Sequence, residues 1–281
     1  MKYRFLAKET TEALIKYLQS WFEQNGPGCN AVIGISGGKD STIAAALCVK
    51  ALGAERVIGV LLPNGVQHDF NIAQKVCETL GIKNLSIPIG TIFEEFQDRY
   101  KMANVHNTLN EVTEQARINL APRIRMTMLR YVAQANNGRL INTSNLSEDW
   151  VGYATVDGDS AGDVSPLCML TVQEVKAIGH ELGLPAELVE KVPEDGLVGT
   201  SDEQTLGITY KDIDTYIREG EGSAEVIEKI NKKFEANKFK IYRMASMPCF
   251  WPEIEMLFDL TEKPTNVEIM SLGMAKDPRF Q

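Results

Sequence analysis

The sequence has no hydrophobic run long enough to cross a membrane. Nowhere in its 281 residues do about 18 apolar residues follow one another without interruption. The first residues, MKYRFLAKETTEALIKY, lack the apolar segment of a signal peptide. With 44% hydrophobic and 24% charged residues, the composition is typical of a soluble globular protein. We therefore expect a cytoplasmic protein with no membrane partner.

Cysteine and histidine are scarce. The five cysteines are scattered, odd in number and never spaced as C-x-x-C, which disfavours a disulfide framework and a structural zinc site. The three histidines have no spacing typical of a catalytic triad or a metal site. We expect free, reduced thiols at Cys29, Cys48, Cys77, Cys168 and Cys249.

The chain has fewer basic than acidic residues. The 29 Lys and Arg against 38 Asp and Glu give 29 − 38 = −9. Because a nucleic-acid backbone needs a basic face, we expect no nucleic-acid partner. An anionic substrate must be met by local positive charge rather than by the field of the whole protein.

The stretch AVIGISGGKDST, residues 31–42, is the most informative part of the chain. Residues 31–35 are apolar and predict a strand buried on both faces, and the Ala/Leu-rich residues 42–52 predict a helix. A glycine turn between a strand and a helix start directs backbone N–H groups and the helix dipole at an anion. Serine hydroxyls and a lysine add donors, and Asp40 can hold a divalent cation. The pattern predicts a nucleotide-phosphate site formed by Gly34, Ser36, Gly37, Gly38, Lys39, Asp40 and Ser41.

This loop has neither the G-x-x-x-x-G-K-[ST] spacing nor the G-x-G-x-x-G spacing of the commoner phosphate loops. The simplest alternative is an ordinary strand-to-helix turn rich in Gly and Ser. SGG-x-DS resembles the pyrophosphate loop of the ATP pyrophosphatases, which adenylate a substrate and hold the departing pyrophosphate there. The motif alone does not choose among the members of that superfamily.

The remaining patterns favour an α/β fold, a doubly wound parallel sheet flanked by helices, in a single domain over residues 1–281. In the stretch 107–136, which has helical character, Pro122 predicts a kink or a break between two helices. The tail 247–281 has no assigned structure. Further strands are expected at 56–62, 84–88 and 139–145, and further helices at 7–22, 67–80, 171–182, 209–219 and 224–236.

Several segments after the loop resemble, in the same order, the ammonia-dependent NAD synthetases. Together with the loop they extend the resemblance from about Ser36 to Tyr216. The segments are LPNGVQHD (62–69), NLAPRIRM (119–126), NTSNLSED (142–149), DGDSAGDVSPL (157–167) and PEDGLVGTSDEQTLGITYKDID (193–214).

The resemblance implies an enzyme that uses ATP and Mg²⁺ to amidate nicotinic acid adenine dinucleotide with ammonia. In the first step an acyl-adenylate forms and pyrophosphate leaves. In the second step ammonia displaces AMP, and NAD is the product. It also implies a homodimer packed through helices between 107 and 135. Since the loop begins by residue 36, we expect no glutaminase before it, and ammonia must arrive free or from another chain.

Site roles follow from the same resemblance. Ser36, Gly38, Lys39 and Ser41 are expected to hold pyrophosphate, Asp40 and Glu148 to share the Mg²⁺, and Thr143 to contact the AMP portion. Arg123 and Arg125 are expected to flank the cleft, at the nucleotide and the second substrate respectively, if Pro122 opens a new helix. Asn119, Asp159 and Asp163 are expected to contact the dinucleotide, with Asp159 also near the amine. The expected catalytic residues are Asp40, Lys39 and Asp159.

The chain also departs from that family's pattern. An arginine and a phosphate-contacting lysine of the family are replaced by Leu61 and Val172, and Glu194 stands where Ser or Thr is usual. Either nearby lysines substitute, or the second substrate differs. Two alternatives therefore stay open: a ligase of the same fold acting on another carboxylate, and a nucleotide-binding protein without turnover.

Overall fold

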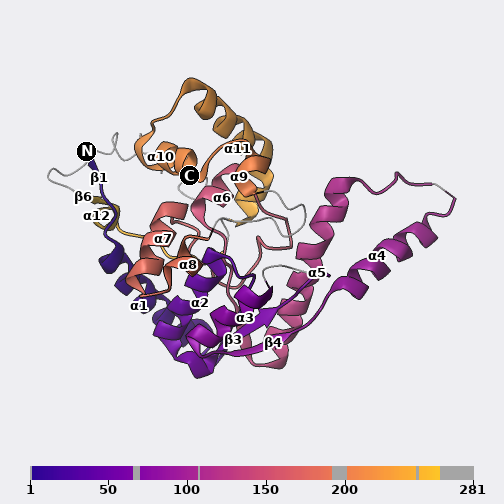
Figure 1. Ribbon diagram of the computed structural model, residues 1–281, viewed down its shortest axis with the longest axis horizontal. Helices are drawn as coiled ribbons and strands as arrows, with labels where there is room; N and C mark the ends of the chain where they lie inside the picture. The colour runs from indigo at the N-terminus through magenta and orange to yellow at the C-terminus, as the bar shows by residue number, and fades with distance from the viewer. Residues whose placement is uncertain (1, 66–69, 107, 192–200, 245–246, 260–281) are drawn as a thin grey trace.

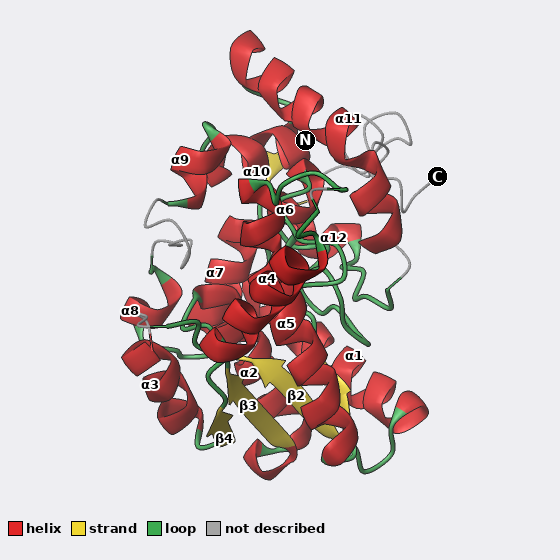
Figure 2. Cartoon of the chain, turned by 90° about the vertical axis from the view of Figure 1, so that its right-hand side faces the viewer, coloured by secondary structure: helices red, strands yellow, loops and turns green. Residues whose placement is uncertain are grey.

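The computed structural model describes residues 2–65, 70–106, 108–191, 201–244 and 247–259. Its centre is a four-stranded parallel sheet with the order β4-β3-β2-β5 (Figures 1 and 2). The strands are β2 (Asn30–Gly34), β3 (Val57–Leu61), β4 (Lys83–Ser86) and β5 (Gly138–Leu140). Each predicted strand exists, although β5 ends well before residue 145.

The sheet is buried on both faces because its central strands carry apolar side chains on both sides. Every residue of β3 is buried, and in β2 Ala31, Val32 and Ile33 are fully buried. Val32 packs in one hydrophobic cluster while Ala31 and Ile33 pack in another, as the two-residue period of a strand requires. The predicted doubly wound α/β arrangement is confirmed.

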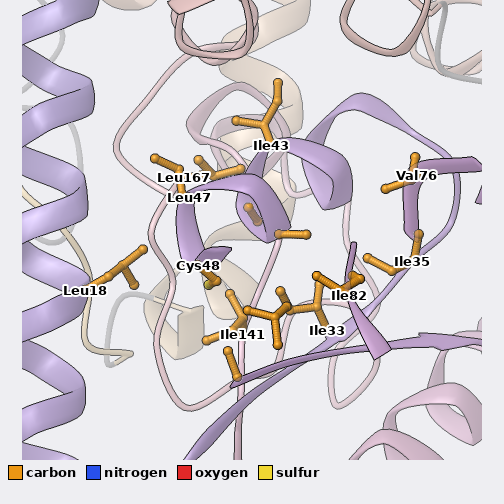
Figure 3. Packing of buried hydrophobic residues seen from close by; sticks show 14 of the residues in the cluster. Leu18, Ile33, Ile35, Ile43, Leu47, Cys48, Val76, Ile82, Ile141 and Leu167 are labelled. Carbon is orange, nitrogen blue, oxygen red and sulfur yellow. The ribbon is translucent and has the colours of Figure 1, made fainter. Parts of the chain in front are cut away.

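The two faces are covered by different helices. On one face Ile33 belongs to the same hydrophobic cluster as Leu18 of α1 (Ala7–Asn25) and Ile43 and Leu47 of α2 (Lys39–Leu52), and Figure 3 labels these residues. Helices α3 (Phe70–Leu80), α7 (Val172–Glu181) and α8 (Ala186–Val189) complete this cluster. The other face is covered by α4 (Gly90–Ala103) and α5 (Glu114–Ala135).

A third cluster forms a group of helices beyond the sheet, here called the helical cap. It consists of α6 (Leu146–Val151), α9 (Asp202–Leu206), α10 (Tyr210–Glu219) and α11 (Ala224–Met244), which lie together at the top of Figure 1. The cap packs around Trp150, Ile213 and Ile230. In the described part of the chain, no helix is both long and apolar enough to cross a bilayer.

The structure corrects three expectations. Pro122 lies inside the continuous helix α5 and neither ends nor opens a helix; packing of Ala121 and Ile124 against the sheet keeps this turn helical without the missing N–H. Helix α4 has no counterpart among the expected helices, and α11 continues beyond residue 236.

Part of the C-terminal tail has structure. Helix α12 (Ile254–Leu257) leads into β6 (Phe258–Asp259), which pairs antiparallel with β1 (Lys2–Tyr3). Residues 260–281 lie outside the described residues, as do 67–69 of the expected helix 67–80. The five cysteines are free thiols, as predicted.

Candidate active site

The loop between β2 and α2 has the geometry that its glycines predict. Gly37 adopts φ 83°, in the left-handed region that favours glycine. The Gly38 N–H donates to Ser36 Oγ at 3.1 Å, and Ser36 Oγ lies 3.2 Å from Ser41 Oγ. The hydroxyl of Thr42 donates to the Gly38 carbonyl at 2.8 Å, which fixes the first turn of α2. Local hydrogen bonds therefore fix the conformation of the loop at the N-terminus of α2.

A cavity of about 1170 Å³ lies at this loop. Residues at the carboxyl ends of β2, β3 and β5 line it. In the sheet, β2 lies between β3 and β5, so the chain that leaves β2 enters the cavity between these two strands. Such a point is where ligands bind in open parallel sheets. The volume exceeds the roughly 300–1,000 Å³ typical of a pocket for one drug-sized ligand, so the cavity is larger than a single ligand of that size requires.

Most of the predicted site residues line this cavity, although they come from distant parts of the chain. The structure brings together Gly34, Ser36, Gly38, Asp40, Ser41, Asn119, Arg125, Thr143, Glu148 and Asp159. It does not bring Gly37, Lys39, Arg123 or Asp163 into the lining. We call Gly34, Ser36, Gly38, Asp40 and Ser41 the loop wall.

Asp40 and Glu148 form a carboxylate pair at the cavity. Asp40 Oδ1 accepts a hydrogen bond from Asn145 Nδ2 at 3.2 Å, and Asn145 and Glu148 form the capping box of α6. Burial raises the pKa of Glu148 well above its usual value, and the nearby charge of Asp40 raises it further. A cation between the two carboxylates would relieve this repulsion.

The pair suits Mg²⁺, which binds one or two protein carboxylates together with substrate phosphates and water. The described residues include no group of three or more His, Cys, Asp or Glu arranged to hold a metal. Asp40 and Glu148 are the residues that would hold the ion.

Lys39 has a different position from the one that the motif predicts. Its side chain is buried, and its Nζ lies 2.6 Å from Asp40 Oδ2 and 5.7 Å from the centre of the Tyr210 ring. Burial by itself lowers the pKa of Lys39, but the charges of Asp40 and Glu148 outweigh it, and the pKa is raised. The ammonium is therefore held among carboxylates instead of facing the cavity.

Helix α5 presents one side to the cavity. Asn119, Pro122 and Arg125 line it at helical spacing, and Arg125 Nε also donates to the Leu62 carbonyl at 3.1 Å. Burial lowers the pKa of Arg125. Because residues two apart lie about 200° around a helix, Arg123 points elsewhere, and its Nε donates to the Val156 carbonyl at 3.1 Å.

The loop 155–163 contributes Asp159 to the cavity. Its Oδ1 accepts from the Thr155 N–H at 2.7 Å, and Thr155 Oγ1 donates to Asn119 Oδ1 at 3.1 Å. Burial within the protein raises the pKa of Asp159, although solvent in the cavity reaches the side chain and backbone hydrogen bonds oppose the shift. Asp159 is thus fixed at the edge of a shared polar network.

Asp163 makes contacts that stabilise the fold. Its Oδ2 accepts from the Leu140 N–H at 2.7 Å, and its Oδ1 pairs with Arg130 of α5. These contacts tie β5 to the loop that follows α6, and they occupy both carboxylate oxygens.

Sequence reasoning missed the part of the lining supplied by α11. Lys233, Asn237 and Lys240 face the cavity at i, i+4 and i+7, and Lys191 adds another lysine. Lys240 Nζ donates to the Gly152 carbonyl at 3.0 Å. That helical spacing is the signal that could have found them. We call Asn119, Arg125, Lys233, Asn237 and Lys240 the helix wall.

Two positions at which the chain departs from the family pattern, Val172 and Leu61, have different places relative to the cavity. Val172 is buried in the helical cap and does not line the cavity. The positive charge at the cavity comes instead from α5, α11 and Lys191. Leu61, the other replacement, lines the cavity with an apolar side chain.

A parallel sheet, a serine–glycine loop at a helix N-terminus and a carboxylate pair beside it define a nucleotide-binding α/β protein of the ATP pyrophosphatase type. Residues 10–248 match the NAD synthase family, and the chain belongs to that family.

Individual proteins that are similar to this chain carry NAD or NMN synthetase names. The NH(3)-dependent NAD(+) synthetase of Methanocaldococcus jannaschii is 38% identical over 216 residues, which cover 75% of this chain and 82% of that protein. The NMN synthetase of Francisella tularensis has a similar structure, with a TM-score of 0.75 and 32% identity over 84% of this chain and 96% of that one. The NH3-dependent NAD synthetase of Campylobacter jejuni gives a TM-score of 0.67 and 25% identity over 88% and 99% of the two chains.

Proposed function

We propose that this chain is an ammonia-dependent NAD synthetase. It amidates nicotinic acid adenine dinucleotide, with ATP cleaved to AMP and pyrophosphate. The observation that carries the proposal is the SGGKDS loop at the cavity together with Asp40 and Glu148 beside it. Loop, carboxylates and helix wall all belong to one cavity large enough for both substrates.

The chemistry proceeds in two displacements. The nicotinate carboxylate attacks the α-phosphorus of ATP, the bond to pyrophosphate breaks, and an acyl-adenylate forms. Ammonia then attacks the acyl carbon, AMP leaves, and a proton is released. Positioning and charge neutralisation supply most of the rate acceleration in such transfers.

Each part of the cavity has a role in this scheme. The backbone N–H groups and hydroxyls of the loop wall hold the departing pyrophosphate. When bound at Asp40 and Glu148, Mg²⁺ would neutralise charge on the phosphate oxygens. Thr143 contacts the AMP portion, and Asn119 and Arg125 contact the dinucleotide. We expect Asp159, which lines the cavity and is exposed there, to accept a proton from the incoming amine.

A second candidate is amidation of the corresponding mononucleotide. The structural similarity to an NMN synthetase favours it, and both substrates present the same nicotinate carboxylate. The helix wall, with its additional cations, is where a second phosphate of the larger substrate would be recognised.

Pyrophosphate release with each substrate tests the proposal. We expect ammonia-dependent release with a higher kcat/KM for the dinucleotide than for the mononucleotide, and NAD identified by mass spectrometry. A preference for the mononucleotide selects the second candidate. Absence of release with either compound would identify a binding protein without turnover, while release only with an unrelated carboxylate would identify another ligase.

We further propose that the protein forms a homodimer through α4 and α5, which extend away from the sheet in Figure 1. Apolar side chains are exposed there: Phe96 is 56%, Met102 67% and Tyr131 71% accessible. We expect the interface between the two copies to cover these apolar side chains. Light scattering should give twice the chain mass of 31.2 kDa; Phe96→Glu should shift the protein towards the monomer.

A further inference from the structure

Lys39 belongs to the phosphate loop in sequence but not to the cavity in space. Its ammonium is held between Asp40 Oδ2 at 2.6 Å and the face of the Tyr210 ring at 5.7 Å. The side chain is 1% exposed, so its contacts are made inside the protein. A lysine that was a simple phosphate ligand would have its end in the cavity.

The surroundings of this ammonium are acidic. Asp202 is buried and accepts hydrogen bonds from Tyr210 Oη at 3.3 Å and from Tyr153 Oη at 3.2 Å. Asp40, Glu148 and Asp202 all line the cavity. Lys39 Nζ is ion-paired with Asp40, and the charges of Glu148 and Asp202 also act on it.

The Lys39 ammonium changes how strongly Asp40, Glu148 and Asp202 can bind a cation. Three carboxylates carry a charge of −3 when ionised, and Lys39 reduces the sum to −2. It also occupies a lone pair of Asp40 Oδ2, the oxygen not used by Asn145. Affinity for a hard divalent cation rises with the charge of its ligands, so the ammonium weakens binding of the metal by itself. Phosphate oxygens restore the missing negative charge.

We propose that Lys39 is a positioning residue: a built-in counter-charge that holds Asp40 and makes binding of the divalent cation depend on the nucleotide. This inference rests on the proposed function, because it takes Asp40 and Glu148 as the metal ligands. The ion then enters with ATP and leaves with pyrophosphate, since the site without phosphate holds it weakly.

Titration with Mn²⁺, followed by the electron paramagnetic resonance of free Mn²⁺, tests the inference with and without ATP. In Lys39→Met we expect Mn²⁺ to bind about tenfold or more tightly in the absence of nucleotide, and the added effect of ATP to shrink. Lys75→Met is the matched control. Lys75 is 55% exposed in an ion pair with Glu187 away from the cavity, and its replacement should leave both affinities unchanged.

Unchanged or weaker Mn²⁺ binding in Lys39→Met overturns the inference, whatever happens to ATP. If that variant does not fold, Lys39→Gln decides, because it keeps a donor for Asp40 without the charge, and it too should bind Mn²⁺ more tightly. Metal binding is measured without the carboxylate substrate. A wrong assignment of that substrate would therefore leave this result standing, and a negative Mn²⁺ result would leave the amidation assay intact.

Discussion

The loop wall and the helix wall line the same cavity but are built in opposite ways. The loop wall comes from eight consecutive residues, 34–41, held by backbone and hydroxyl hydrogen bonds of about 3 Å within the loop. The helix wall comes from residues as far apart as Asn119 and Lys240, on α5 and α11, with long side chains that reach solvent. The loop wall is thus fixed by contacts within one short stretch of chain, whereas the helix wall depends on how two distant helices pack.

We expect this difference to matter at Val172, where the resemblance to the family places a lysine. A change in the loop alters backbone geometry and with it every phosphate contact. A lysine in the helix wall can be replaced by another lysine nearby, because a cation on a flexible stem satisfies a phosphate from several positions. We therefore expect the cavity to bind phosphate without a lysine at position 172, because Lys191, Lys233 and Lys240 line it.

The largest expected effect is that of Asp40→Asn in the loop wall. It removes one of the two carboxylates proposed to hold Mg²⁺, and turnover should fall by about 10²–10³-fold, the loss typical when one electrostatic group that stabilises a transition state is removed. Pyrophosphate release measures the loss, and thermal unfolding checks the fold. Glu187→Gln, on an exposed ion pair, is the control. Retained turnover would remove Asp40 from the metal site.

Gly37→Ala should have the next largest effect. A left-handed conformation costs a non-glycine residue about 1–2 kcal/mol, and here it must be adopted at φ 83° within the loop. We expect lower stability and a Michaelis constant for ATP raised at least about tenfold.

Gly81→Ala is the matched control for this variant. Gly81 has φ 63° with open space where the methyl group of an alanine would stand, and it lies between α3 and β4, outside the cavity lining. It should lose similar stability in urea unfolding without any change in ATP affinity. Equal ATP affinity in the two variants would show that the loop conformation does not matter for phosphate binding.

Lys233→Met should have a smaller effect, because it removes one solvated cation from the helix wall. We expect the Michaelis constant for the dinucleotide to rise by about 3–10-fold with kcat nearly unchanged, and the loss to shrink at high salt. Lys229→Met, on the same helix in an ion pair with Glu225, is the control. An effect of Lys233→Met on kcat alone would assign the lysine a role in the chemical step instead.

Asp214 supports the helical cap and should affect stability more than activity. Its two oxygens accept from the Ser147 hydroxyl and from the Gln173 N–H, and burial raises its pKa from 3.8 to about 6. Because the folded pKa is the higher one, the contribution of this group is fully present below about pH 4 and is lost as the pH rises through 6.

The measurement is the difference in unfolding free energy between wild type and Asp214→Asn across this range. The wild type should lose up to about 3 kcal/mol relative to the variant between pH 4 and 7, with kcat at pH 7 little changed. A difference that does not vary with pH would mean that Asp214 has an ordinary pKa.

The sequence alone predicted the strands of the sheet and the glycine turn that follows β2. An apolar run predicts β2, a left-handed turn requires Gly37, and the hydroxyl hydrogen bonds join residues at most five apart. All of these signals are local, so a short stretch of sequence contains them completely. The continuity of α5 through Pro122 was not local, because packing against the sheet overrides the cost of proline there.

Only the tertiary structure decided which charges face the cavity. Arg125 lines the cavity, whereas Arg123 points away from it. Asp163 binds β5 and Arg130. Lys39 is buried against Asp40 and Tyr210. The tertiary structure also brought lysines of α11 to a loop some 200 residues earlier in the chain. The physical reason is that the direction and charge environment of a long side chain depend on elements packed around it, and those elements are distant in sequence.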